Sequence, residues 1–170
     1  MLSYGKTFGI DVRVTRSCNN YGPRQHSEKL IPTIIANVLN NDSIPIYGTG
    51  RNFREWIYVH DNCAAIDLIA KKGASGEIYN IGSGVRLSNL ELIDLFRKQF
   101  PEYKFTVSLV NDRPGHDFGY ALNSNKIRSL GFKTQYSIEK GLSETFEWYK
   151  NSFNTTFTCK YGCQSSSVSG

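Results

Sequence analysis

The segment SIPIYGTGRNFREWIYVHDNCAAIDLIAKKG, residues 43–73, holds two short apolar and aromatic runs and then a longer, helix-like run. The runs at 43–48 and 53–59 are rich in β-branched and aromatic residues and flank a glycine-containing turn, so we predict two strands. Asp61 precedes the longer run and Gly73 follows it, which predicts a helix with an aspartate cap and a glycine stop. Strand and helix thus follow one another directly, as in an α/β fold.

The same mixture extends in both directions. Ile10 to Thr15 alternate apolar and polar side chains and predict a strand, and 76–84 and 104–110 predict two more. Helices are expected at the N-terminus, at 30–41, and after Ser88–Glu91, where SNLE forms a capping box. A short helix is expected within 123–132, and a last helix over 137–153 capped by Ser137. We therefore predict an α/β fold over residues 1–153, followed by a small, polar and disordered tail at 154–170.

Bulk composition excludes several classes of protein. The formal net charge is +5, but lysine and arginine are spread along the chain among acidic residues, which argues against a nucleic-acid partner. No apolar run approaches the roughly 18 residues needed to span a bilayer, and the first residues do not resemble a signal peptide. We therefore expect no membrane partner, a cytoplasmic location and reduced thiols.

Several motifs do not identify a functional site. The strings GTGRNF and GSGVRL lack the third glycine of a dinucleotide fingerprint. Cys159 and Cys163 have no second ligand pair, so no metal site is expected. Tyr136 and Lys140 form a Tyr-x-x-x-Lys pattern, but Tyr136 precedes the expected cap of its helix, and we treat the match as chance.

Three other stretches have the right chemistry for an anionic, flat ligand. Asn19 and Asn20 follow a predicted strand, where α/β sheets place ligands, although an ordinary turn explains them equally well. Tyr47 or Trp56 could stack on a base, and Arg51 or Arg54 could clamp a diphosphate, although core aromatics and surface arginines would look the same. Asn89 lies in the first turn of a capped helix, where backbone N–H groups favour an anion, but a plain helix start is the simpler explanation.

The loop at 110–123, VNDRPGHDFGYALN, places Arg113 and His116 on either side of a rigid Pro-Gly turn. A fixed loop can aim a pair of cations at a phosphate. A surface turn without function could have the same composition, so the loop is only a candidate.

Taken together, the stretches RSCNNYGPRQHSEKLIP, IPIYGTGRNFREWIYVHDNCAAI, GEIYNIGSG, SNLELI and NDRPGHDFGYALNSNKI follow one another as in a known family. From residue 1 to about 151 the chain resembles the C-terminal half of NAD-dependent nucleotide-sugar 4,6-dehydratases, above all those acting on dTDP-glucose. These are extended short-chain dehydrogenases. The resemblance implies the end of a Rossmann sheet plus a smaller mixed α/β substrate-binding domain.

The resemblance also implies site residues. It makes Asn20 a contact to NAD near the nicotinamide, and it makes Arg113 the diphosphate clamp of a loop that closes over the nucleotide-sugar. The substrate contacts that it implies are Asn19, Lys29, Leu30, Pro45, Ile46, Tyr47, Arg54, Asn89, Asp112, Arg113, Pro114, Gly115 and His116.

In this family NAD takes a hydride from C4 of the glucose, water leaves across C5 and C6, and the hydride returns to C6. The glycine-rich NAD loop, the catalytic Tyr-x-x-x-Lys and an Asp-Glu pair lie in the family's other half, so no catalytic residue is expected in this chain. We expect it to be a portion of a longer, homodimeric enzyme and inactive alone. A related UDP-sugar dehydratase, epimerase or decarboxylase stays open as an alternative, as does a non-catalytic nucleotide-sugar-binding module.

Overall fold

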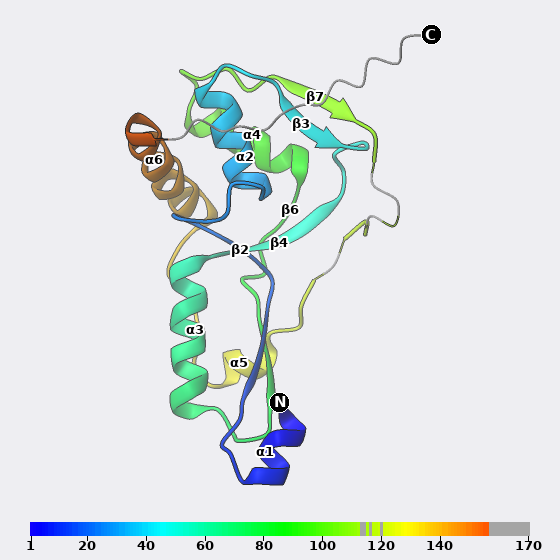
Figure 1. The fold of residues 1–170 in the computed structure, drawn as a ribbon, viewed down its shortest axis with the longest axis vertical. Helices are drawn as coiled ribbons and strands as arrows, with labels where there is room; N and C mark the ends of the chain where they lie inside the picture. Colours follow the sequence, from blue (N-terminus) through cyan, green and yellow to red (C-terminus); the bar gives the residue numbers. More distant parts are fainter. Residues whose placement is uncertain (113–114, 116, 120, 157–170) are drawn as a thin grey trace.

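The computed structural model describes residues 1–112, 115, 117–119 and 121–156. Helices and strands are mixed along this whole length (Figure 1), which confirms the predicted α/β fold. The helices are α1 (Leu2–Phe8), α2 (Leu30–Leu39), α3 (Val59–Lys72), α4 (Asn89–Gln99), α5 (Asn125–Ser129) and α6 (Ile138–Thr156). The strands are β1 (Val14–Ser17), β2 (Asn19–Tyr21), β3 (Ile44–Tyr47), β4 (Phe53–Tyr58), β5 (Ile78–Ile81), β6 (Arg86–Ser88) and β7 (Val107–Val110).

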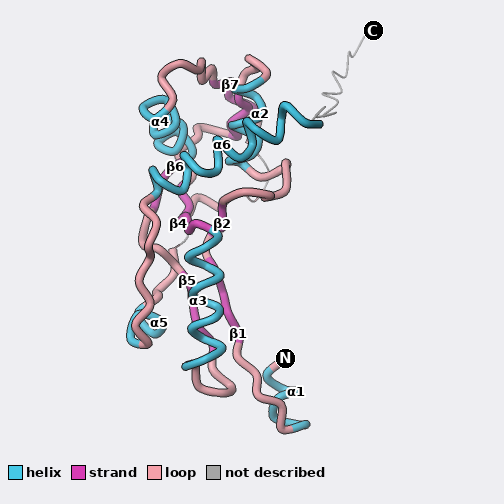
Figure 2. Tube along the Cα trace, turned by 90° about the vertical axis from the view of Figure 1, so that its left-hand side faces the viewer, coloured by secondary structure: helices cyan, strands magenta, loops and turns pink. Residues whose placement is uncertain are grey.

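The described strands form small sheets that follow one another along the molecule. β1 pairs in parallel with β5, and β3 pairs in parallel with β7. Between these pairs, β4 is parallel to β2 and antiparallel to β6. Figures 1 and 2 show α3 and α5 near the β1–β5 sheet, whereas α2, α4 and α6 gather at the other end with the β3–β7 sheet.

The strand β4 separates two apolar cores, because the last four of its residues are all buried. Side chains alternate along a strand, so Trp56 and Tyr58 face one way and Ile57 the other. The upper core contains Trp56 and Tyr58 and is completed by α2, α4 and α6, among them the fully buried Phe96 of α4. The lower core contains Ile57 and is completed by α3, β5 and α5.

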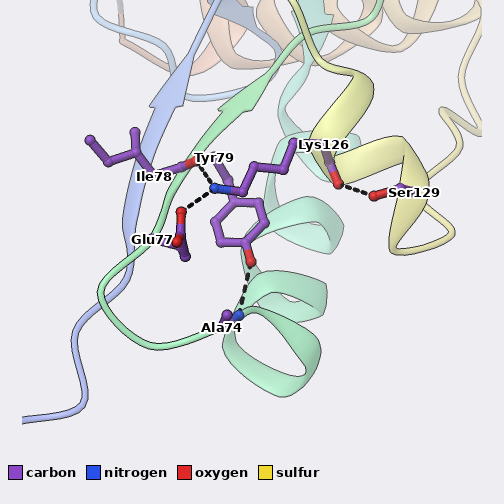
Figure 3. A network of polar contacts seen from close by, with 6 residues as sticks. All are labelled: Ala74, Glu77, Ile78, Tyr79, Lys126 and Ser129. Atoms are coloured by element: carbon purple, nitrogen blue, oxygen red, sulfur yellow. Dashed lines mark hydrogen bonds and ion pairs between the residues drawn. The ribbon is translucent and has the colours of Figure 1, made fainter.

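Lys126 fixes the short helix α5 on β5 (Figure 3). Its Nζ donates to a carboxylate oxygen of Glu77 at 2.5 Å and to the carbonyl oxygen of Ile78 at 3.0 Å. The same Nζ lies 4.6 Å from the ring centroid of Tyr79, whose hydroxyl accepts the N–H of Ala74 at 2.8 Å. A five-residue helix is too short to be stable alone, so these contacts hold it in place.

The predicted start of α3 is wrong. The helix begins at Val59 with Tyr58 as its N-cap residue, so Asp61 lies inside the first turn. The Asp61 carboxylate accepts the backbone N–H groups of Gln135 and Tyr136 at 2.9 and 3.1 Å. Asp61 therefore joins α3 to the segment before α6 and does not cap its own helix.

Other boundaries differ as well. The first strand starts at Val14 and not at Ile10, because its pairing with β5 begins there. The capping box at Ser88 is confirmed in both of its hydrogen bonds. The helix α6 continues to Thr156, three residues beyond the expected end, and the rest of the expected tail lies outside the described residues. Across the described part of the chain, no helix is both long and apolar enough to cross a membrane.

Candidate functional site

A pocket of about 300 Å³ opens where β2, β3 and β4 meet the first turns of α2 and α4. Seven residues expected to contact substrate line it, namely Asn19, Leu30, Pro45, Ile46, Tyr47, Arg54 and Asn89. Three residues that were not among the expected substrate contacts complete its wall, namely Glu28, Thr33 and Trp56. We refer to this cavity below as the main pocket.

Strand register explains why the polar residues of the main pocket meet. Asn19 in β2 lies directly opposite Trp56 in β4. Arg54 is two residues before Trp56, and side chains alternate along a strand, so both lie on the same face. An amide, an indole and a guanidinium therefore share one face of the β2–β4 pair.

The guanidinium of Arg54 is held by backbone carbonyl groups. Its Nη2 donates to the carbonyl oxygen of Asp117 at 3.0 Å, and its Nη1 donates to those of Phe53 and Phe118 at 2.7 and 3.5 Å. Asn52 donates its amide to the carbonyl of Asp117 as well, at 3.1 Å. These carbonyl groups orient the guanidinium beside the main pocket.

The strand β3 supplies an apolar and aromatic wall. The side chain of Ile46 is buried in the upper core, whereas Tyr47 is 42% exposed. The turn after Tyr47 needs glycine: Gly50 has φ 70°, and a Cβ there would lie 2.8 Å from Cγ of Leu90 and 2.9 Å from Cγ2 of Ile46. An exposed aromatic ring beside a pocket is suited to stacking on a flat base.

The start of α4 does not offer its backbone to an anion. The N–H of Asn89 donates to the carbonyl of Asn52, and the N–H of Leu90 donates to that of Gly50, both at 3.2 Å. The N–H of Glu91 donates to Oγ of Ser88, also at 3.2 Å. These first-turn N–H groups are therefore bonded within the chain, as in the plain helix start that the sequence favoured, and Asn89 serves the main pocket as a lining residue.

Of the two substrate contacts expected at the start of α2, one lines the main pocket and one does not. Leu30 lines the main pocket, but Lys29, the N-cap residue of α2, is exposed and does not line it. Glu28 lines it one residue earlier, and Thr33 lines it about one helical turn after Leu30. The Oγ1 of Thr33 donates to the carbonyl of Ser27 at 3.1 Å, which ties α2 to the preceding loop.

Asn20 lies outside the main pocket, since it follows Asn19 in the strand and points to the other face. Its side-chain nitrogen Nδ2 donates to the backbone carbonyl of Cys18 at 3.1 Å, and its backbone carbonyl accepts a hydrogen bond from Nε2 of Gln25 at 2.7 Å. Its Oδ1 is buried and has no hydrogen-bond partner among the described residues. The two neighbouring asparagines therefore serve opposite sides of β2.

The loop after β7 is only partly described. Asp112 and Gly115 are exposed and do not line the main pocket. A Cβ placed on Gly48 would lie 2.6 Å from Oδ2 of Asp112, so the loop passes close to the turn after β3. Arg113, Pro114 and His116 lie outside the described residues.

The other motifs gain no role. Lys140 lies 4.4 Å from the ring centroid of Tyr136, over the ring face. No group of side chains suited to a metal ion is found in the described ranges, and Cys159 and Cys163 lie outside them. A second, more polar pocket beside Glu55, Arg86 and Arg128 contains none of the expected site residues.

Burial raises the pKa of the Tyr21 and Tyr58 hydroxyls, which belong to the core behind the main pocket. The hydroxyl of Tyr58 also donates to a carboxylate oxygen of Glu144 at 2.8 Å, which raises its pKa further. Both phenols therefore stay protonated at neutral pH and act as structural groups.

Comparison with known proteins gives a consistent result. The model of the NAD dependent epimerase/dehydratase family matches residues 1–82. A dTDP-glucose 4,6-dehydratase from Streptomyces niveus is 47% identical over 151 residues, which are 88% of this chain and 45% of the relative. A low-salt glycan biosynthesis protein from Haloferax volcanii is 46% identical over 147 residues, which are 86% of this chain and 47% of the relative.

Among solved structures, the dTDP-glucose 4,6-dehydratase DesIV of Streptomyces venezuelae matches with a TM-score of 0.84 and 43% identity, over 90% of this chain and 48% of that one. This confirms the expected extended short-chain dehydrogenase fold. The chain spans about half the length of the curated relatives it matches. The chain therefore resembles the C-terminal half of dTDP-glucose 4,6-dehydratases, and its first 82 residues match the model of the NAD dependent epimerase/dehydratase family.

Proposed function

We propose that the chain forms the nucleotide-sugar-binding part of an NAD-dependent dTDP-glucose 4,6-dehydratase, which makes dTDP-4-keto-6-deoxyglucose. The observation that carries the proposal is the convergence of seven expected contact residues, from five separate segments of the chain, on the main pocket. The similarity to dTDP-glucose 4,6-dehydratases supports the same reading.

The chemistry of the main pocket suits each part of the ligand. Arg54 is placed to bind the diphosphate, because its guanidinium lines the main pocket and is oriented by backbone carbonyls. Tyr47, with Pro45 and Ile46, offers a stacking and apolar wall to the nucleobase. Asn19 lies across the strand pair from Trp56 and can donate to and accept from a sugar or phosphate oxygen.

NAD, when bound, supplies the hydride acceptor for oxidation at C4 of the glucose. The buried Oδ1 of Asn20, which has no partner within the described residues, fits an amide N–H of such a cofactor. We assign binding and orientation to this chain's residues and no catalytic step. Cytoplasmic location and homodimerisation of the whole enzyme stay predictions.

Calorimetric titration of the 170-residue chain with dTDP tests the proposal. Arg54→Gln should weaken binding about 10- to 150-fold, because a hydrogen bond to a charged group contributes roughly 1.5–3 kcal/mol. Arg16→Gln is the matched control, since Arg16 is an exposed arginine of β1 outside the main pocket. Failure of the folded wild-type chain to bind dTDP would contradict the proposed function.

The same titration tests the alternative, a UDP-sugar enzyme. dUDP differs from dTDP only by the methyl group of the base, and UDP adds a ribose hydroxyl. A methyl group buried against Pro45 and Tyr47 should make dTDP bind at least about fourfold more tightly than dUDP. Equal or stronger binding of UDP would favour the UDP-sugar alternative.

A further inference from the structure

The indole N–H of Trp56 is an unsatisfied donor at the main pocket. Trp56 is 4% exposed and lines this pocket, yet its Nε1 is buried with no acceptor among the residues that the structure describes. An indole has one hydrogen-bond donor and no acceptor, so only an acceptor atom can satisfy Nε1–H. Leaving a buried donor without an acceptor is costly, and such groups in native proteins call for a reason.

The backbone N–H and carbonyl of Trp56 both have partners. Among the described residues, Nε1 is therefore the one polar atom of Trp56 without a partner. Its backbone N–H donates to the carbonyl of Val85 at 2.9 Å, and its carbonyl accepts Oγ of Ser83 at 2.5 Å. The ring meets the edge of Tyr21, with the two ring centroids 6.4 Å apart. The indole is thus fixed in place before any ligand arrives.

The neighbours of Trp56 indicate which part of a ligand would meet it. Arg54 precedes it by two residues on the same face of β4, a spacing of about 6.7 Å in a strand. Asn19 lies directly across on β2, about 4.8 Å away between strands. Trp56 therefore lies next to Arg54, which we propose binds the diphosphate, and next to Asn19, which we propose contacts the sugar-nucleotide.

We propose that Nε1–H of Trp56 donates a hydrogen bond to an oxygen of the nucleotide-sugar where the diphosphate joins the hexose. The proposal rests on the proposed function and adds a binding residue that the family resemblance does not imply. Binding would satisfy a donor that burial has already separated from water. A ligand without an oxygen at this place would leave the donor unpaired and be disfavoured.

Nuclear magnetic resonance of the wild-type chain tests this directly. The chain has two tryptophans, so a ¹H–¹⁵N spectrum should contain two indole N–H signals, and Trp148→Phe identifies the signal of Trp56. Saturating dTDP-glucose should move the Trp56 signal downfield and slow its exchange with solvent. Thymidine, which has neither diphosphate nor hexose, should not. If dTDP alone moves the signal, the acceptor is a diphosphate oxygen; if only dTDP-glucose moves it, the acceptor is on the sugar.

Calorimetry gives an independent test. Trp56→Phe should bind dTDP-glucose roughly tenfold more weakly than wild type, and Trp148→Phe should bind it equally well. The proposal is overturned if dTDP-glucose binds the wild-type chain while the Trp56 signal stays in place, and the proposed function then still stands. Absence of any dTDP-glucose binding to the folded wild-type chain overturns the proposed function itself. The wild-type spectrum decides the question even if Trp56→Phe does not fold.

Discussion

Asp61 is a buried carboxylate that joins segments far apart in the sequence. It is 3% exposed, and its two oxygens accept the backbone N–H groups of Gln135 and Tyr136. Asp61→Asn replaces one acceptor oxygen by a donor that faces another donor, so we expect the free energy of unfolding to fall by about 2–3 kcal/mol. Urea denaturation measures this.

Asp67→Asn is the matched control for Asp61. Asp67 is an exposed aspartate of the same helix, paired with Lys71 at 2.7 Å. Exposed pairs of this kind contribute little, so the control should cost under about 0.5 kcal/mol. Equal losses in the two variants would show that the contacts of Asp61 are not stabilising.

At the residue scale, the sequence predicted the identity of most main-pocket residues but not their geometry. Two of the missed residues had a signal: Trp56 follows Arg54 at the strand period of two, and Thr33 follows Leu30 at a helical spacing. Two of the carbonyls that hold Arg54 carried no such signal, because they lie 63 and 64 residues away. Asp61 was misread for the same reason.

At the scale of the element, the capping box of α4 fixes one side of the main pocket. The Oγ of Ser88 accepts the N–H of Glu91, and the Glu91 carboxylate accepts the N–H of Ser88 at 2.7 Å. Ser88→Ala should lower the free energy of unfolding by about 1 kcal/mol and weaken dTDP binding through Asn89, the next residue. Ser88→Thr, which keeps the hydroxyl, is the control. An alanine variant with unchanged stability would show that the cap is not needed.

The capping box also predicts a pH dependence. Accepting the N–H of Ser88 lowers the pKa of Glu91 below its ordinary value of 4.5. A pKa lowered by folding gives stability that is present above 4.5 and is lost as pH falls through the lowered value. Glu91→Gln should therefore make the decline in stability below about pH 4.5 less steep. Thermal unfolding at a series of pH values measures this decline. An unchanged acid decline would contradict this origin.

At this scale the capping box at Ser88 was predicted correctly, whereas element boundaries that depend on contacts with distant segments were not. The box at Ser88 lies within four neighbouring residues, so the sequence contains all of it. The first strand begins at Val14 only because β5 begins its pairing there, and no local pattern reveals this. The helix α3 begins three residues before the predicted start, since Asp61 binds backbone groups 74 and 75 residues away and is not the cap that its position suggested.

At the scale of the whole molecule, β4 makes the two cores one cooperative unit. Ile57 is 1% exposed and packs in the lower core, while Trp56 beside it in sequence packs in the upper core. A strand with both faces buried cannot lose one face without disturbing the other. Two halves with separate strands would instead open independently.

Ile57→Ala should therefore weaken both cores. We expect a loss of about 2–5 kcal/mol, the usual cost of truncating a large buried side chain to alanine. Hydrogen exchange followed by mass spectrometry should show faster exchange in α2 and α4 of the upper core as well as in α3 and β5. Ile66→Ala is the matched control, because Ile66 lies in α3 and is 43% exposed. Faster exchange confined to α3, β5 and α5 would show that the cores unfold separately, and that the main pocket, which is bounded by α2 and α4, does not depend on the lower core.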